Sequence, residues 1–202
     1  MKISSVLVLT VFALLTFGLW AYLNKETTID AWPDVRFGGF SFSPFRPGQD
    51  ATKDEWPTDE QIDEDLALVA PHAINIRTYS SRGTLADIPQ LAAKHKLQVA
   101  MGAYLYPDNK ELNEQEIAGA IKLANENSNV IRLIIGNETL FRQAMSVEEL
   151  EKILDRVRAQ TRKPVSTAEQ WHIWLNLHPE LAQHVDFIAV HFLPYWESMS
   201  VD

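Results

Sequence analysis

The sequence has 202 residues, of which 27 are acidic, 18 are basic and none is cysteine. Lys2 is the only charged residue before Lys25, so the remainder carries 17 basic against 27 acidic side chains. This acidic balance disfavours nucleic acid and anionic lipid headgroups as partners. The absence of cysteine excludes disulfides, thiolate catalysis and cysteine-ligated zinc. With 46% hydrophobic and 22% charged residues, the chain beyond its first 24 residues is expected to form one globular domain.

The first 24 residues have the pattern of a membrane anchor. Residues 3–24 carry no charge, and about 20 apolar residues suffice for a helix to cross a bilayer. A cleaved secretory signal usually ends a shorter apolar core with small residues spaced A-x-A, whereas Leu19-Trp20-Ala21-Tyr22 contains no such pair. We therefore expect an uncleaved anchor, with a cleaved signal and a secreted product as the alternative. Lys2 and the amino terminus favour the cytoplasmic side, which would place the domain in the periplasm or at the cell surface.

Residues 25–35 are expected to form a linker, and residues 36–202 repeat a pattern of strand followed by helix. The predicted strands cover residues 36–44, 73–79, 97–105, 130–136, 164–169 and 185–191. The predicted helices begin at the caps Thr58, Asn113 and Ser146 or cover residues 85–95 and 173–184, with Glu149 completing a capping box at Ser146. The fourth strand is so continuously apolar that we expect both of its faces to be covered.

Six strands with helices between them indicate parallel pairing with right-handed crossovers, which fits a doubly wound sheet or a (β/α)8 barrel. Polar residues decide between these folds, because they follow several different strands. They are Tyr79, Tyr104, Asn137, Glu138, Glu169 and the run from His191 to Glu197. Barrel enzymes collect their chemistry at the carboxyl ends of their strands, and the sequence contains no Gly-rich nucleotide-binding turn. We therefore predict an incomplete (β/α)8 TIM barrel of about six β/α units, preceded by one N-terminal transmembrane helix.

A short motif at the end of the fourth strand connects the sequence to a known family. The run Ile135-Gly-Asn-Glu138 resembles the Gly-Asn-Glu of glycoside hydrolase family 17, the β-1,3-glucanase family, particularly its bacterial membrane-associated members. Four further stretches match in the same order and at compatible spacing. They are Phe40-Ser-Phe-Ser-Pro44, Ile76-Arg-Thr-Tyr79, Pro164-Val-Ser-Thr-Ala-Glu169 and His191-Phe-Leu-Pro-Tyr-Trp-Glu197. The resemblance implies a retaining two-carboxylate enzyme that hydrolyses or transfers β-glucan, with β-1,3 linkages expected and no cofactor.

Asn137 and Glu138 suit glycoside cleavage on chemical grounds as well. The reaction needs a carboxylic acid that protonates the leaving oxygen, and a Glu beside a barrel mouth meets that need. A neighbouring Asn can hydrogen-bond the sugar 2-hydroxyl, and this bond strengthens toward the transition state. The alternative is that the two residues cap the helix after the strand. The resemblance implies that Glu138 is the acid/base and that Asn137 orients the substrate.

Other strand ends are expected to contribute to the same site. Arg77 and Tyr79 match the family's Arg-x-Tyr and are expected beside the catalytic carboxylates, where a positive charge favours the ionised form and a hydroxyl can donate. Arg77 could equally form a core-facing ion pair, and His191 could be a structural histidine. The predicted substrate-binding set consists of Asn137, Arg77, Tyr79, Tyr104, Glu169, His191, Tyr195, Trp196 and Glu197.

Aromatic residues are candidate platforms for sugar rings, because a flat ring covers the apolar C–H face of a pyranose. Tyr104, Tyr195 and Trp196 lie at strand ends and are expected to serve in this way. Helical spacing favours Trp171 and Trp174 as core residues instead. The histidines show no metal-binding spacing, so we expect no metal in the site.

One part of the family's machinery has no counterpart in the sequence. A retaining mechanism needs a second carboxylate about 5 Å from the first, acting as nucleophile, and in the family it follows the seventh strand in a segment like Glu-Thr-Gly-Trp-Pro. No such segment occurs, and Glu169 and Glu197 match fifth- and sixth-strand positions. Three hypotheses therefore stand: the anchored front part of a glucan-cleaving or glucan-transferring enzyme, a non-catalytic glucan-binding protein, and an inactive truncated product.

Overall fold

The computed structural model describes residues 3–25 and 36–198 and separates the chain into two units, Met1–Val35 and Arg36–Asp202. In the first unit, α1 (Ile3–Leu23) is a single helix, and its side chains from Ser5 onward are exposed. By length and composition, Ser5–Leu23 could cross a membrane, and a signal sequence has the same properties. The predicted N-terminal helix is confirmed, whereas the expected linker lies outside the described residues except for Lys25.

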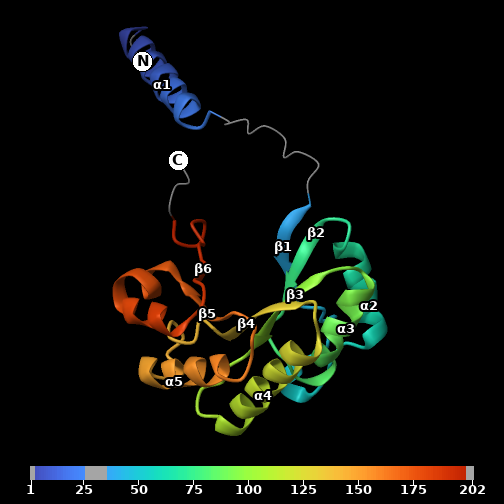
Figure 1. Ribbon diagram of the computed structural model, residues 1–202. Coiled ribbons are helices and arrows are strands. Elements are labelled where there is room, and N and C mark those ends of the chain that lie inside the picture. The colour runs from blue at the N-terminus through green and yellow to red at the C-terminus, as the bar shows by residue number, and fades with distance from the viewer. Residues whose placement is uncertain (1–2, 26–35, 199–202) are drawn as a thin grey trace. The chain divides into compact units, whose positions relative to one another are not determined.

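The second unit contains a parallel sheet of six strands in chain order. The strands are β1 (Phe37–Ser41), β2 (Ala73–Arg77), β3 (Gln98–Ala103), β4 (Val130–Asn137), β5 (Val165–Gln170) and β6 (Ala189–His191). Helices cover the outer side of the sheet, which curls around an open interior as part of a barrel does (Figure 1). The predicted incomplete barrel is confirmed, and a doubly wound sheet is excluded because the strand order never reverses.

The helices that cross between strands begin at well-defined caps. The helical segments are η1 (Ala51–Lys53), α2 (Asp59–Val69), η2 (Gly83–Asp87), α3 (Ile88–Lys94), α4 (Lys110–Glu126), α5 (Val147–Arg158), η3 (Ile173–Leu177) and η4 (Pro179–His184). Thr58 and Gln61 form a capping box in front of α2, and the Ser146 side chain accepts from the backbone N–H of Glu149 in front of α5. Both predicted caps are therefore confirmed, whereas the capping box predicted at Ser146 is only half formed, because the structure shows no return bond from the Glu149 side chain to the backbone of Ser146.

Asn113 does not cap its helix, contrary to the prediction. Helix α4 begins at Lys110 behind Asn109, whose side chain accepts from the N–H of Leu112, and Asn113 is buried inside the helix. The Asn113 amide instead pairs with both backbone groups of Tyr106, at 2.7 and 3.0 Å. This bond to the preceding loop explains why a residue type that favours caps occurs inside a helix.

The segment after β5 also differs from the prediction. The sequence predicts one helix over residues 173–184, but the chain forms a π-helical turn and then a 3₁₀ helix, separated at His178 in front of Pro179. Proline cannot donate to a helix, and it disfavours a helical conformation in the residue before it. The last strand is also shorter than expected, with Ala189–His191 in place of residues 185–191.

One hydrophobic core lies between the sheet and its helices. Its largest fully buried side chains are Ile62, Leu66, Ile76, Ile88, Leu97, Met101, Leu105, Leu133, Ile135, Leu150, Leu154 and Leu181. In β4, Leu133 and Ile135 point to this core, whereas Arg132 is exposed and lines the open interior. On the inner face Ile134 is nevertheless buried, beside Ala100 and Ala168. The expectation that both faces of this strand are covered is therefore confirmed at Ile134 and wrong at Arg132.

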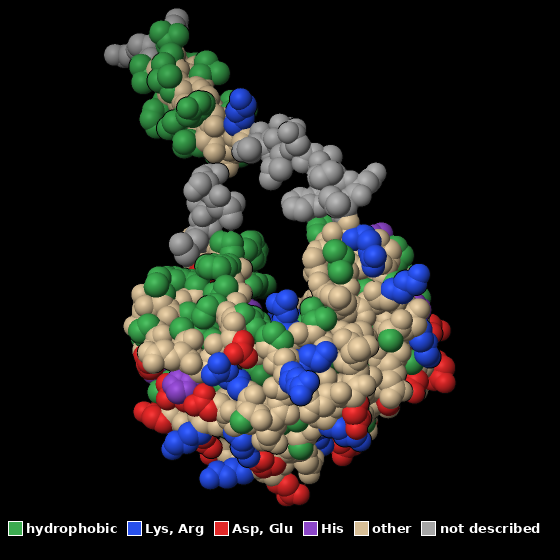
Figure 2. Space-filling view, in the orientation of Figure 1, with side chains coloured by type: hydrophobic (Ala, Val, Ile, Leu, Met, Phe, Trp, Pro, Cys, Tyr) green, Lys and Arg blue, Asp and Glu red, His purple; other side chains and the backbone are tan. Residues whose placement is uncertain are grey.

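The inner face of the sheet borders an open cavity of about 370 Å³. Its lining includes Phe40, Arg77, Arg132, Ile134, Phe187 and His191. Figure 2 shows the hollow in this unit, with hydrophobic side chains along its rim and acidic and basic side chains over the helices. Within the described residues, β1 pairs only with β2 and β6 only with β5. Apolar side chains lie on these two strands or next to them, with Phe40 39% and Ile188 50% exposed.

We expect residues 25–202, produced without the first helix, to self-associate, because an open strand edge with exposed apolar side chains invites pairing between molecules. The joint substitution Phe40→Lys and Ile188→Lys should lower the associated fraction, since charges at an edge oppose such pairing. Leu68→Lys is the matched control, because Leu68 is 72% exposed but lies on α2. Sedimentation velocity measures the distribution, and a monomeric unsubstituted domain would contradict the expectation.

Candidate active site

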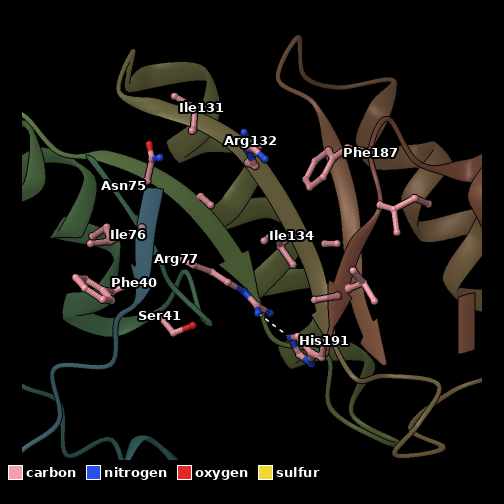
Figure 3. A pocket seen from close by; sticks show the side chains of 16 residues that line it. Phe40, Ser41, Asn75, Ile76, Arg77, Ile131, Arg132, Ile134, Phe187 and His191 are labelled. Carbon is pink, nitrogen blue, oxygen red and sulfur yellow. Dashed lines mark hydrogen bonds between the residues drawn. The ribbon is translucent and has the colours of Figure 1, made fainter. Parts of the chain in front are cut away.

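Four polar side chains meet at the carboxyl ends of three strands. Arg77 ends β2, Asn137 ends β4 with Glu138 directly after it, and His191 ends β6. Arg77 Nη2 donates to Asn137 Oδ1 at 2.8 Å, and Arg77 Nη1 reaches across the open interior to within 2.9 Å of His191 Nε2 (Figure 3). His191 Nδ1 lies 2.8 Å from Glu138 Oε1. These four residues form one chain of hydrogen bonds, which we call the Arg77 cluster.

The backbone at the end of β4 takes an unusual path that presents Asn137 and Glu138. Gly136 has a φ of +89° and Glu138 a φ of 53°, both in the left-handed region. A Cβ at position 136 would collide with the Thr139 hydroxyl, so the position requires glycine. A non-glycine residue held at positive φ costs about 1–3 kcal/mol and often marks a functional site. The N–H of Glu138 donates to Ala168 O at 2.7 Å, which helps to hold this conformation.

Two alternative interpretations of these residues do not hold. Asn137 and Glu138 do not cap the next helix, because α5 begins at Val147 behind its cap Ser146. Arg77 makes no ion pair with a carboxylate within residues 36–198, and its guanidinium bonds an amide oxygen and an imidazole instead. The sequence-predicted residues of three strand ends are thus directed at one another.

Arg77 is the half-buried centre of the cluster. Its guanidinium lies 4.8 Å from the centre of the Tyr79 ring, where the ring face attracts a cation. Burial lowers the pKa of Arg77 from its ordinary value, and the neighbouring Tyr79 and Glu138 oppose that shift. Tyr79, which the sequence places near the catalytic carboxylates, therefore adjoins the cluster through Arg77.

Arg142 is a second cation beside the cluster, and no motif in the sequence predicts it. Its Nε donates to Asn137 O and its Nη2 to Leu105 O, both at 3.1 Å, so it ties the end of β4 to the segment after β3. Its guanidinium also lies 4.7 Å from the centre of the Tyr104 ring. The sequence offers one weak sign of this role, a basic residue four positions after Glu138. The sign is weak because both hydrogen-bond partners of Arg142 are backbone oxygens, which any residue type can supply.

An aromatic cavity of about 520 Å³ adjoins Arg142 at the ends of the first three strands. The aromatic rings in its lining are Phe42, Phe45, Tyr79, Tyr104 and Tyr106. Tyr104 and Tyr106 pack edge to face, with ring centroids 4.8 Å apart. Flat apolar walls with a few polar groups suit the C–H face of a sugar.

Glu169 lies behind the cluster and is fully buried. Its carboxylate accepts from the backbone N–H groups of Leu140 at 2.9 Å and Phe141 at 3.3 Å, in the loop after Glu138. Burial raises the pKa of Glu169, the charge of Glu138 adds to that effect, and the backbone donors oppose it. Because none of its surface is exposed, the predicted direct contact between Glu169 and a substrate does not fit its placement.

The predicted residues beyond β6 lie apart from the Arg77 cluster. Tyr195 and Trp196 are 84% and 77% exposed and pack against each other at 5.3 Å. Glu197 accepts from Trp171 Nε1 at 3.0 Å. Trp174 is buried as predicted, whereas Trp171, also predicted as a core residue, is only partly buried. Among the residues described, none of these side chains hydrogen-bonds to the cluster, and no group of three His, Cys, Asp or Glu side chains could hold a metal ion.

Glu169→Gln is expected to lower the free energy of unfolding by about 1–3 kcal/mol, because its NH₂ group would face a backbone N–H and leave a buried donor unpaired. Since the pKa of Glu169 is raised, folding favours the protonated carboxyl. The difference in unfolding free energy between the unsubstituted protein and the variant should therefore be largest at low pH. It should decline as the pH rises above the ordinary pKa of 4.5 and through the raised pKa of Glu169. Chemical denaturation over this range measures the difference, and a constant difference would contradict the assignment.

Comparisons with known proteins support a glycan-active domain. The model of the BtgE/BtgC glycoside hydrolase domain matches residues 39–202, whereas a search of curated proteins gave no match. The glycoside hydrolase family 17 β-1,3-glucanosyltransferase from Rhizomucor miehei shares the fold with a TM-score of 0.67 at 20% identity, over 82% of this chain and 60% of that chain. An endo-laminarinase from Formosa Hel1_33_131 has a TM-score of 0.66 at 20% identity, over 79% of this chain and 50% of that chain.

These structural likenesses show the fold, and the family match shows the kind of domain. An active-site mutant of the Rhizomucor miehei enzyme, solved in complex with laminaritriose, has a TM-score of 0.66 at 20% identity, over 80% of this chain. The chain spans between 50% and 60% of the length of these three structures. The matched residues include the whole Arg77 cluster. The chain therefore belongs to the BtgE/BtgC glycoside hydrolase family, and its predicted resemblance to glycoside hydrolase family 17 is confirmed.

Proposed function

We propose that this domain acts on β-1,3-linked glucan, with Glu138 as the general acid/base. The observation that carries the proposal is the pair Asn137–Glu138 at the end of β4, contacted by Arg77 and His191 from two other strand ends. Barrel hydrolases collect their catalytic groups in this place. The solved complex of the Rhizomucor miehei glucanosyltransferase with laminaritriose supports β-1,3-glucan as the substrate class.

Asn137 is assigned to the sugar 2-hydroxyl. Because a guanidinium only donates, Arg77 requires the Oδ1 atom of Asn137 to face it, and the amide NH₂ group is left to donate elsewhere. A donor beside the acid/base suits the 2-hydroxyl oxygen, and this bond strengthens as the sugar ring gains positive charge in the transition state.

Glu138 is assigned to both proton transfers. In the first step its proton moves to the glycosidic oxygen as the bond to the anomeric carbon breaks. In the second step the carboxylate takes a proton from the incoming nucleophile, and the glycosyl group is transferred to that oxygen. Water as the acceptor results in hydrolysis, and a sugar hydroxyl results in transglycosylation.

The retaining mechanism also needs a nucleophilic carboxylate about 5 Å from the acid/base. Glu169 is buried against backbone N–H groups, and Glu197 is bonded to Trp171, so neither is placed for this role. We assign the nucleophile to sequence outside residues 1–202. On this assignment the 202-residue chain by itself binds glucan without turnover, which is the second candidate function.

We further propose that α1 anchors the domain on the extracytoplasmic side of a membrane. The apolar segment Ser5–Leu23 is long enough to span a bilayer, and Lys2 at its leading end favours a cytoplasmic amino terminus. Cleavage of this helix as a signal would yield a secreted domain instead.

Laminaritriose is expected to bind the 202-residue chain, and Asn137→Ala should weaken binding roughly fivefold, the effect of losing one hydrogen bond of about 1 kcal/mol. Glu138→Gln should bind nearly as well as the unsubstituted protein, because the amide keeps the shape of the carboxyl group. Asn125→Ala is the matched control, since Asn125 is exposed on α4 and bonds Gln160 O. Isothermal titration calorimetry measures the affinities, and equal binding by Asn137→Ala and Asn125→Ala would refute the role of Asn137.

Turnover is expected once the remaining β/α units are supplied in cis, for example by a hybrid in which the C-terminal part of the Rhizomucor miehei enzyme follows residue 202. In that hybrid, Glu138→Gln should lower glucan cleavage about 10²- to 10⁴-fold, because the amide supplies no proton. Aryl glycosides whose leaving groups need no protonation should be spared in the first step. Equal losses on both substrates, or sugar release by the 202-residue chain itself, would contradict the assignments.

A further inference from the structure

The direction of every hydrogen bond in the Arg77 cluster follows from Arg77. A guanidinium stays protonated in proteins, donates and never accepts. His191 Nε2, at 2.9 Å from Arg77 Nη1, must therefore accept and carries no proton. The other ring nitrogen, Nδ1, then carries the proton and donates to Glu138 Oε1 at 2.8 Å.

A positively charged His191 does not fit this geometry. An Nε2–H group would point at the N–H groups of Arg77, which would bring two donors and two positive charges within 2.9 Å of each other. The charged groups that contact the ring are Arg77 from β2 and Glu138 after β4, and the charge of Glu138 in turn acts on the buried Glu169 from β5. The Tyr79 ring adjoins the guanidinium, with its centre 4.8 Å from Arg77 Cζ. Arg77, which contacts Nε2, thus prevents this nitrogen from carrying a proton.

We propose that Arg77 locks His191 in the neutral Nδ1–H tautomer, and that His191 thereby makes Oε2 of Glu138 the oxygen that carries the catalytic proton. Oε1 already accepts the imidazole N–H, and the carbonyl oxygen of a protonated carboxyl group is a better acceptor than its hydroxyl oxygen, so this bond favours the proton on Oε2. Oε2 hydrogen-bonds to none of the described residues, and the Glu138 side chain is 20% exposed. The assignment of Oε2 rests on the proposed function, whereas the tautomer does not.

His191 is a positioning residue in this scheme. The Oε2–H bond of Glu138 breaks as the proton moves to the glycosidic oxygen, and the electrons of the broken glycosidic bond remain on that oxygen. The negative charge left on the carboxylate is met by a His191 N–H that is already in place at Oε1. A preorganised donor of this kind stabilises developing charge without rearrangement.

The tautomer is measured on the full chain, labelled with ¹⁵N-histidine and held in detergent micelles without substrate. The chain has six histidines, and His191→Gln identifies the signals of His191 by their loss. Near neutral pH we expect one protonated and one unprotonated ring nitrogen, with the long-range proton couplings of the Nδ1–H form. An Nε2–H form or a doubly protonated ring in the unsubstituted protein would overturn the proposal.

Two further variants test whether Arg77, and not Glu138, sets the tautomer of His191. Arg77→Met should abolish the unprotonated Nε2 signal or move the proton between the nitrogens, whereas Glu138→Gln should keep the tautomer because Arg77 still sets it. Arg132→Met is the matched control, since Arg132 lines the same cavity and lies over the Phe187 ring, whereas the hydrogen-bond partners of His191 are Arg77 and Glu138. An unchanged tautomer in a folded Arg77→Met protein would overturn the lock, and if that variant does not fold, the unsubstituted protein still decides the outcome.

The role of Oε2 is tested in the active hybrid. His191→Phe should lower kcat on glucan more than it changes KM, because the donor at Oε1 is lost in the transition state. His191→Asn should restore part of the activity, since its amide N–H can stand where Nδ1 stood. Equal loss in both variants would overturn this role. Failure of the proposed function would appear differently, as a hybrid that is inactive with His191 in place.

Discussion

The donor-only chemistry of one guanidinium is the constraint on which the site depends. Arg77 bonds residues that are 60 and 114 positions away in the sequence. Each must present an acceptor to it, so the Asn137 amide turns its oxygen inward and the His191 ring turns its unprotonated nitrogen inward. The NH₂ group of Asn137 is then left to donate toward the open side, and the Nδ1–H group of His191 donates to Glu138. A single half-buried charge thus sets the polarity of the whole cluster.

Two buried carboxylates hold the loops behind that cluster. Glu116 on α4 accepts from the Ser80 hydroxyl at 2.6 Å and from the N–H of Ser81 at 2.8 Å, in the loop after β2, and Glu169 does the same for the loop after β4. Burial raises the pKa of both carboxyl groups, and their hydrogen-bond donors oppose the shift. Replacing either carboxylate would leave several buried donors unpaired, which is costly. The loops that follow β2 and β4, next to the side chains of the site, are therefore held in place by buried hydrogen bonds.

Local patterns predict most of the fold and the centre of the site, but not the contacts that join distant segments. The strand order and the pair Asn137–Glu138 follow from hydrophobic periodicity and from a motif, both of which are local. Asn113 has a residue type that favours caps, and its bond to a preceding loop has no local signature. Glu169 stands at a strand end like a catalytic residue, yet its burial depends on how the loop after β4 folds over it. Arg142 bonds backbone atoms, which no side-chain pattern reveals.

The curvature of the sheet is what brings the cluster together. In a flat sheet, β2 and β6 would be separated by four strand spacings, or about 19 Å, which is far beyond the reach of an arginine side chain. The contact of 2.9 Å between Arg77 and His191 therefore requires the sheet to curl until its two sides face each other across the open cavity. β6 has only three residues and pairs with β5 through Ala168, Glu169 and Gln170. The bond to Arg77 is consequently a second restraint on the position of His191, so the geometry of the site and the curl of the sheet support each other.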